Sequence, residues 1–562
     1  MRVRRSLQEV VSNYDSGNRT ELENLIRAFR VIQKLPVDHP DSFFRIAGYH
    51  GEPFVSEAPA GQDPDEWWGG YCQHRTILFP TWHRAYLHRL EEALRNAVPQ
   101  AEDLALPFWD ECISYGTKEN PIPWIVTARE LSEPVDGEFD NPLFSYTLQV
   151  AVADNHNVSK TGKQKNHRYS KPAGYETVRY PLSGLVGNDE DRAITELHNS
   201  DFTDDSTNTE HLNDNVKAWM GNTIRLKNKS NSSKKILDTY SSYSKYKICL
   251  EAPNYTAFSN KTSMAAWVNK HPGDYGISLE DPHNEIHLAV GGKPQFAGDN
   301  VDRTTPGKIK GANGDMGENE TAAFDPIFFF HHAFIDYAFW QWQLRHGKTK
   351  ANSLEILKGY GGVTSTGSPG LPAKTDLDLD TPLQPFTKAG GSAFTSNDVT
   401  DIEGSLGYTY SIGSLDRKVL SGPVLNGPDK SPITHVLRVT NINRADYSGS
   451  FVVRVMAKLA NGERVEIGRD AVLSRWHVDG CANCLNHLNE QVFVPIDDEL
   501  MALIKGDGDE DITDKIHVFV QKRDDPDRDE EGGDDSPASA HPVFPTPPGL
   551  SAPRRQPVID LL

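Results

Sequence analysis

Histidines are the residues of this sequence whose types and spacing could support chemistry. The segment 323–343 is strongly apolar and aromatic, yet it contains the adjacent pair His331 and His332. A buried imidazole without a partner costs roughly 1–3 kcal/mol, so such a pair needs hydrogen-bond partners or a metal ion. Neighbouring residues on a helix point about 100° apart. Only one of the two rings can therefore face a given site, and the other must turn away into a supporting role.

A second pair of histidines lies in the segment LEDPHNEIHLAVGG, residues 279–292. His283 and His287 are four residues apart, so a helix places both on one face, the usual geometry for two ligands of one metal ion. The two glycines at the end of the segment favour termination of that helix. The alternative interpretation of this spacing is an exposed polar helix face.

The first hundred residues add three candidates, His50, His74 and His83. Cys72 precedes His74 by two residues, and His83 begins an amphipathic segment with helical spacing. His88 follows His83 by five residues and would point about 140° away from it. We therefore expect His88 on the surface and the other three at a site.

Two triplets of histidines thus occur far apart in the chain: His50, His74, His83, and then His283, His287, His332. Neutral nitrogen ligands suit copper better than magnesium or calcium, and zinc with three histidines is the alternative. The doubled arrangement favours two metal ions in one pocket. A dinuclear hydrolase would use bridging carboxylates, and none occurs at these spacings.

The bulk composition limits the classes of protein. The chain has 562 residues, a formal net charge of −21 and a pI near 5.4, which argue against nucleic acid and anionic membranes as partners. It contains no apolar run of 18 residues, and residues 1–17 lack the apolar core of a signal peptide, so we expect a cytoplasmic protein that does not associate with membranes. Five cysteines are too few for a disulfide scaffold of this size.

The elements that must position the histidines fall into two expected domains and a tail. Residues 22–34 have the apolar spacing of a core-facing helix, and residues 114–275 read as loops and short helices around a helical scaffold. Short β-branched runs at 436–439, 450–457, 464–467, 491–494 and 515–520 predict an antiparallel β-sandwich-like domain. We assign a catalytic domain to 1–414, the β domain to 415–522, and a disordered acidic, proline-rich tail to 523–562.

These motifs resemble the tyrosinase, catechol oxidase and haemocyanin family of type-3 dinuclear copper proteins. The resemblance rests on Cys72-x-His74 with TWHRAYLHRLE, on the H-N-x-x-H motif that begins at His283, and on DPIFFFHHAFID around His332, and it covers roughly residues 20–410. The Tyr408-x-Tyr410 pair is similar to that of fungal-type latent tyrosinases. The family resemblance implies a mainly α catalytic domain, a helical bundle around the dicopper centre.

The resemblance also implies roles for individual residues. His50, His74 and His83 would hold one copper ion, and His283, His287 and His332 the other. Cys72 would form a thioether bond to His74, Phe328 would shield the metals from water, and His331 would support the ligands from behind. Glu280 and Asn284 would hold a water that takes the proton of a phenol, although Glu280 also suits the N-terminus of a helix on charge grounds alone. Asp336 is followed by Tyr337, where many relatives have arginine, which puts an arginine-anchored support in doubt.

The β domain contains Cys481 and Cys484 in a C-x-x-C motif. Such a pair could be half of a zinc site, a redox pair, a copper carrier or two ordinary buried thiols. Resemblance to latent tyrosinases implies copper loading, and a domain that caps the site until proteolysis, as in a zymogen. Trp476 is our candidate for the side chain that plugs the pocket.

The resemblance therefore implies oxidation of small phenols by O2. Monophenols such as tyrosine would be hydroxylated at the ortho position and o-diphenols oxidised to o-quinones, towards melanin-type pigments. The alternatives are a catechol oxidase without the hydroxylation step and a haemocyanin-like O2 carrier. An activating protease and a homo-oligomer are compatible with the sequence.

Overall fold

The structure, a computed structural model, covers most of the chain. It describes residues 1–51, 70–153, 170–187, 189–221, 225–227, 233–235, 240–293, 311–416, 433–476, 478, 485–506, 511–523 and 550–562. The predicted copper-loading pair, Cys481 and Cys484, lies outside these residues. Within them no helix is long and apolar enough to cross a membrane.

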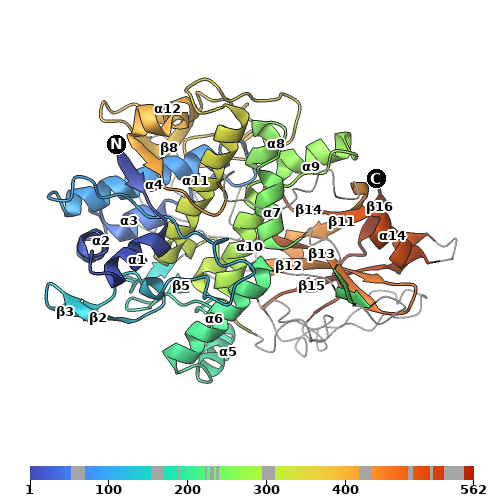
Figure 1. The fold of residues 1–562 in the computed structure, drawn as a ribbon, viewed down its shortest axis with the longest axis horizontal. Helices are drawn as coiled ribbons and strands as arrows, with labels where there is room; N and C mark the ends of the chain where they lie inside the picture. The colour runs from blue at the N-terminus through green and yellow to red at the C-terminus, as the bar shows by residue number, and fades with distance from the viewer. Residues whose placement is uncertain are drawn as a thin grey trace.

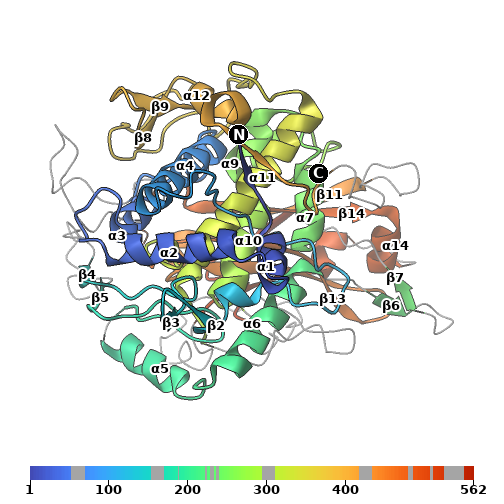
Figure 2. The same cartoon turned by 60° about the vertical axis from the view of Figure 1, so that its left-hand side comes forward.

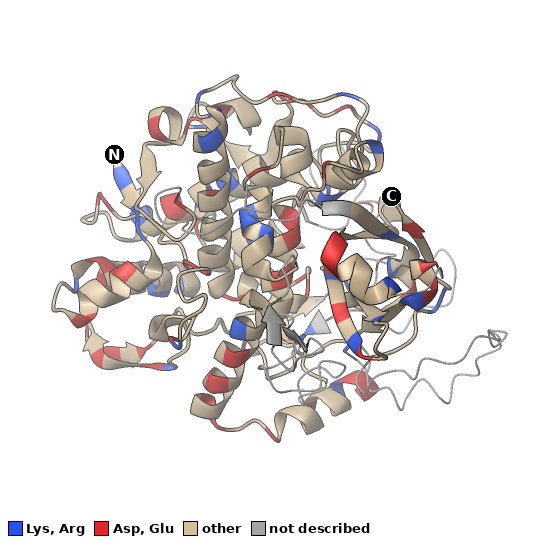
Figure 3. Ribbon diagram, turned by 45° about the vertical axis from the view of Figure 1, so that its right-hand side comes forward, with Lys and Arg blue, Asp and Glu red and all other residues tan. Residues whose placement is uncertain are grey.

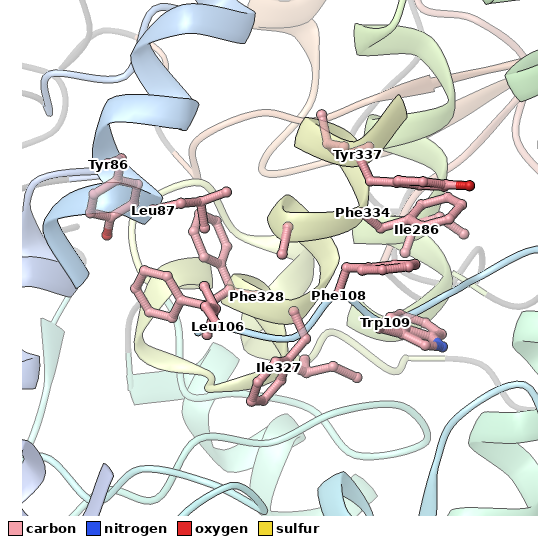
Figure 4. Packing of buried hydrophobic residues seen from close by; sticks show 14 of the residues in the cluster. Tyr86, Leu87, Leu106, Phe108, Trp109, Ile286, Ile327, Phe328, Phe334 and Tyr337 are labelled. Atoms are coloured by element: carbon pink, nitrogen blue, oxygen red, sulfur yellow. The ribbon is translucent and has the colours of Figure 1, made fainter. Parts of the chain in front are cut away.

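Four helices form the core that will carry the histidines: α2 (Thr20–Lys34), α4 (Phe79–Ala97), α10 (Glu280–Gly291) and α11 (Ile327–His346). Helix α4 packs against both α2 and α11, and α10 contacts α11 (Figures 1 and 2). Helix α2 buries its apolar face together with Arg30, whereas α11 is largely apolar all round and is buried on every side from 327 to 343. Aromatic rings fill the space around α11: Tyr86 lies beside Phe328, and Phe108 stacks on Tyr337 at 4.6 Å between ring centres (Figure 4).

Shorter elements surround this core. The further helices are α1 (Leu7–Asp15), α3 (Phe43–Gly48), α5 (Asp189–Asn199), α6 (Asp205–Met220), α7 (Ser242–Cys249), α8 (Tyr255–Ser259), α9 (Lys261–Lys270), α12 (Ser396–Thr400) and α14 (Asp498–Lys505). Small hairpins are formed by β2 (Glu130–Val135) with β3 (Glu138–Asp140), β4 (Val152–Ala153) with β5 (Ser170–Lys171), β6 (Arg225–Lys227) with β7 (Ser233–Lys235), and β8 (Pro382–Thr387) with β9 (Ala393–Thr395). Basic residues are scattered among acidic ones over the described part of the chain (Figure 3).

The N-terminal strand closes the helical part from behind α11. Strand β1 (Arg2–Arg4) pairs in parallel with β10 (Tyr408–Tyr410). The buried guanidinium of Arg4 donates to Glu91 at 2.8 Å and to Asp336 at 3.2 Å, and it lies over the ring of Tyr408. Asp336 also accepts from Arg84 Nε at 2.5 Å. Two arginines from distant segments therefore contact Asp336, although the residue that follows it is Tyr337.

The C-terminal part consists of two three-stranded antiparallel sheets. One has the order β14 (Asn489–Asp497), β11 (Ile433–Asn443), β16 (Val558–Leu561), and the other β13 (Arg464–Val472), β12 (Phe451–Lys458), β15 (Ile516–Gln521). All five strands predicted from the sequence are confirmed. The molecule is mainly helical with small sheets, and these two do not form a clear sandwich. The domain boundaries at 414/415 and 522/523 stay predictions.

The prediction of a disordered tail over 523–562 is wrong for its last residues. Residues 524–549 lie outside the described part, but residues 558–561 form strand β16 along the edge of β11. Arg438 of β11 pairs with Asp560 at 2.8 Å. The acidic, proline-rich composition ends before this β-branched stretch, which finds an open strand edge to pair with.

Breaking the buried ion pairs of Arg4 should destabilise the fold. In Arg4→Met two fully buried carboxylates lose a partner, and we expect the free energy of unfolding to fall by about 3–5 kcal/mol. Arg2→Met is the matched control, because Arg2 also contacts Glu91 but its side chain is 20% exposed, so the loss should be about 1 kcal/mol or less. Urea unfolding followed by circular dichroism measures both. Equal losses would contradict the role given to Arg4.

Candidate metal centre

The first histidine triplet converges as predicted. His50 follows α3, His74 lies in the loop before α4, and His83 is in the second turn of α4. Their ring centres are 5.1–5.5 Å apart, and one nitrogen from each ring lies within 4.8 Å of the others. All three rings are buried.

The second triplet joins two helices. His283 and His287 lie one turn apart on α10, and His332 reaches them from α11. His332 Nε2 is 3.3 Å from His283 Nε2 and 3.4 Å from His287 Nε2. A nitrogen of His331 lies within 4.8 Å of nitrogens of the same three residues.

The two triplets adjoin. The rings of His83 and His332 stack with centres 4.4 Å apart, and those of His74 and His283 are 5.4 Å apart. Phe328, which is fully buried, packs against His50 at 4.8 Å and against His332 at 4.2 Å. Six imidazoles from two segments that lie far apart in the sequence therefore form one cluster, and Phe328 packs against both triplets.

Oxygen atoms around the cluster fix which ring nitrogen carries the proton. His83 Nδ1 lies 2.8 Å from Phe79 O, His287 Nδ1 lies 2.8 Å from Met316 O, and His283 Nδ1 lies 3.0 Å from Asn284 Oδ1. Oxygens of this kind only accept hydrogen bonds, so each Nδ1 is the donor and each Nε2 keeps a lone pair. This is the hydrogen-bonding pattern that orients metal-binding histidines.

The inward nitrogens fit a metal ion. His283 Nε2 and His287 Nε2 both present lone pairs to His332 Nε2, which can donate to only one of them. His50 is fully buried, and neither of its nitrogens has a hydrogen-bond partner among the described residues; the same holds for His83 Nε2. Converging lone pairs in apolar surroundings repel each other, and a bound cation would relieve this. A donor set of nitrogens alone suits copper or zinc.

Burial also keeps the imidazoles neutral, as metal ligands must be. Removal from water lowers the pKa of His83 to about 3, and it lowers the pKa of His50, His283 and His332 well below the ordinary value. The neighbouring rings add to this effect for His50, His283 and His332, because charging one ring beside another is unfavourable.

The supporting residues differ in part from expectation. The Nδ1 side of the His331 ring faces away from the histidine cluster. His331 Nδ1 lies 2.5 Å from Glu111 Oε1, a partner that the sequence did not reveal. His88 is buried, so its predicted surface position is wrong: α4 is covered on that side as well, and Phe394 packs against the His88 ring. Cys72 is a buried free thiol whose pKa burial raises to about 11.

Glu280 and Asn284 lie one turn apart at the start of α10, and both are buried. The Glu280 carboxylate accepts from the backbone N–H of Arg75 at 3.1 Å and of Lys261 at 3.0 Å. The first of these bonds holds the loop that follows His74, where Arg75 has a left-handed backbone with φ 64°. Burial raises the pKa of Glu280.

Strand β13 covers the outer side of α10. Asn284 Nδ2 donates to Ala471 O at 3.4 Å, and Arg469 pairs with Glu285 at 3.2 Å. Lys261 pairs with Asp470 at 2.5 Å. These contacts form a junction between the C-terminal sheets and the helical part of the molecule. Across this junction, the Arg75 side chain also pairs with Glu490 of β14 at 2.5 Å. The C-terminal sheets are thus joined to α10, to α9 and to the loop that follows His74 by ion pairs buried from water.

The apolar contacts of this junction do not favour Trp476 as the plug. Trp476 packs with Val186 in a small cluster of its own. Ala471 and Leu473 instead belong to the main hydrophobic core, which includes Phe328.

Comparison with known proteins gives consistent results. The family model described as the common central domain of tyrosinase matches residues 40–345. The chain is 46% identical to tyrosinase HcTyr2 of Hahella sp. over 88% of both chains, and 44% identical to a tyrosinase of Aspergillus oryzae over 85% of this chain and 87% of that one.

Solved structures agree with this. A tyrosinase from Burkholderia thailandensis at low pH has a TM-score of 0.75 at 40% identity, with both chains fully covered. Holo-protyrosinase from Aspergillus oryzae has a TM-score of 0.60 at 18% identity, covering 93% of this chain and 94% of that one, which is a likeness of fold.

The folded protein should retain its metal at pH values well below the ordinary histidine pKa of about 6.5. With the His83 pKa at about 3, protons compete for that ring in the folded protein only at low pH, whereas an unfolded chain takes them up near 6.5. After loading with Cu²⁺ and dialysis at about pH 5, metal analysis should find the ion in the folded protein and not in a urea-unfolded control. Loss near pH 6 from protein with native circular dichroism would contradict this.

Proposed function

The chain belongs to the tyrosinase family of copper oxidases, and from that premise we propose that it hydroxylates monophenols at the ortho position and oxidises o-diphenols to o-quinones. The observation that carries the proposal is the cluster of six buried imidazoles with their lone pairs turned inward. The products would lead towards melanin-type pigments.

We assign the ligands as two triplets. His50, His74 and His83 would hold one copper ion, and His283, His287 and His332 the other. When bound, the copper pair supplies the activation of dioxygen and the oxidation of the phenol. The contacts of His83 Nδ1 and His287 Nδ1 with backbone oxygens would hold these rings in place before the metals arrive.

Two further residues would shape this pocket. A thioether between Cys72 and the His74 ring would lock that ring; its support is the two-residue spacing and the burial of the thiol. Phe328 would exclude water, since its buried ring touches histidines of both triplets.

Glu280 and Asn284 are our candidates for proton handling. A phenol has a pKa of about 10, so its proton must be removed before the oxygen binds metal well. The raised pKa of Glu280 makes this carboxylate a better base than an exposed glutamate. Asn284 lies between His283 and strand β13, where its amide could hold a water for this step.

We also propose that the protein is made in a latent form. The support is the row of buried ion pairs that joins β13 and β14 to α10 and its neighbours, together with the likeness of fold to a protyrosinase. A protease that removes the C-terminal sheets would then expose the pocket. Copper loading through Cys481 and Cys484, and a cytoplasmic location, remain part of the proposal.

Activity assays with matched variants test the proposal. The copper-loaded, protease-treated enzyme should convert both tyrosine and an o-diphenol to quinone, measured by absorbance. His332→Gln should lose one of two bound copper ions and at least a hundredfold in activity, whereas His88→Gln, a buried histidine outside both triplets, should keep both.

The outcomes separate the alternatives. Turnover of the diphenol alone would establish a catechol oxidase. Reversible O2 binding with two coppers and no quinone would establish an O2 carrier.

Weakening the junction should raise the activity of the uncut enzyme. In Asp470→Asn the buried ammonium of Lys261 loses its closest ion-pair partner, which disfavours the closed arrangement by a few kcal/mol. We expect diphenol turnover to rise several-fold before any protease treatment. Asp446→Asn, which breaks a partly exposed ion pair with Arg555 away from α10, is the control and should change nothing. If Asp470→Asn and the unaltered chain have equal activity, the proposal that these ion pairs keep the enzyme latent is overturned.

A further inference from the structure

Glu111 is a fully buried carboxyl group beside the second triplet that the proposed function does not use. Its segment is attached to α11 by the hydrogen bond from Trp109 N to Phe330 O, at 3.0 Å. Glu111 Oε1 lies 2.5 Å from His331 Nδ1, and Glu111 Oε2 accepts from the hydroxyl of Tyr246, also at 2.5 Å. Both carboxylate oxygens are therefore held in one orientation, one by each of two buried side chains.

The other nitrogen of His331 lies next to the metal ligands. His331 Nε2 is buried and has no hydrogen-bond partner among the described residues. The His331 ring is 4.9 Å from the His287 ring, and it stacks on the His283 ring with centres 5.3 Å apart. The His331 ring therefore packs behind the second triplet. Among the described residues, Glu111 is the only hydrogen-bond partner of that ring.

We propose that Glu111 is a positioning residue for the second copper site. It fixes the His331 ring through Nδ1, and that ring in turn holds His283 and His287 in the geometry that binds metal. Tyr246 keeps the carboxylate in place by occupying its second oxygen. Residues that orient metal ligands in this indirect way typically contribute about 10–100-fold to metal affinity. The inference rests on the proposed dicopper function.

Replacing the carboxylate tests the proposal. Glu111→Leu keeps most of the volume and removes the anchor, so copper at the second site should bind about 10–100-fold more weakly, measured by titration against a competing chelator. The electron paramagnetic resonance spectrum of Glu111→Leu loaded with one equivalent of Cu²⁺ should also differ from that of the unaltered chain. Glu111→Gln can still accept from His331 and should restore affinity to within a few-fold of the unaltered chain.

Two controls separate positioning from general damage. Cys112→Ala alters the neighbouring buried residue and should leave both copper affinities unchanged. In a His331→Phe background, Glu111→Leu should have no further effect, because Glu111 acts through that ring. The melting temperature of each metal-free variant reports whether it folds.

The outcomes distinguish the inference from its premise. If the unaltered chain does not bind two copper ions, the proposed function fails. If it binds two and Glu111→Leu binds both equally well, only the positioning role is overturned. An undiminished effect of Glu111→Leu in the His331→Phe background, or an equal effect of Cys112→Ala, would also overturn it.

Discussion

The structure depends on keeping six imidazoles neutral, dry and turned towards each other. Desolvation does the first part, because it lowers the pKa of these rings. Orientation needs an oxygen behind the rings, and backbone carbonyls of Phe79 and Met316 supply two of them. The arrangement is unfavourable without a cation, since it forces lone pairs together. The surrounding fold must therefore be rigid enough to hold it.

That rigidity comes from the helices and from what lies behind them. Helix α11 is largely apolar on every side, so it can sit in the centre of the helical part and carry His332 there. Its one buried acid in the central turns, Asp336, is neutralised by Arg84 of α4 and Arg4 of β1. The same ion pairs connect the N-terminal strand with α4 and α11, and the hydroxyls of Tyr408 and Tyr410 donate hydrogen bonds to Asp336 as well. The histidine cluster is thus supported by a second buried polar cluster about one helical turn further along α11.

The sequence predicted which histidines converge better than it predicted the residues that support them. Helical spacing is local, so the positions of His283 and His287 on one face could be read directly. The partners of the supporting residues are far away: Glu111 is 220 residues from His331, and Arg4 is 332 residues from Asp336. Periodicity also misplaced His88, because it gives the angle around a helix but not whether neighbours cover that side. Strand β16 was missed since composition upstream of it dominated the tail.

The pairing of β1 with β10 has a consequence for biosynthesis. Arg4 and Tyr410 are 406 residues apart, yet they touch in the finished molecule. A ribosome delivers β1 long before its partner strand exists, so β1 has no strand to pair with while the roughly 400 residues in between are translated. Completion of the helical body is therefore necessarily a late event, and nascent chains released early lack the strand that closes it.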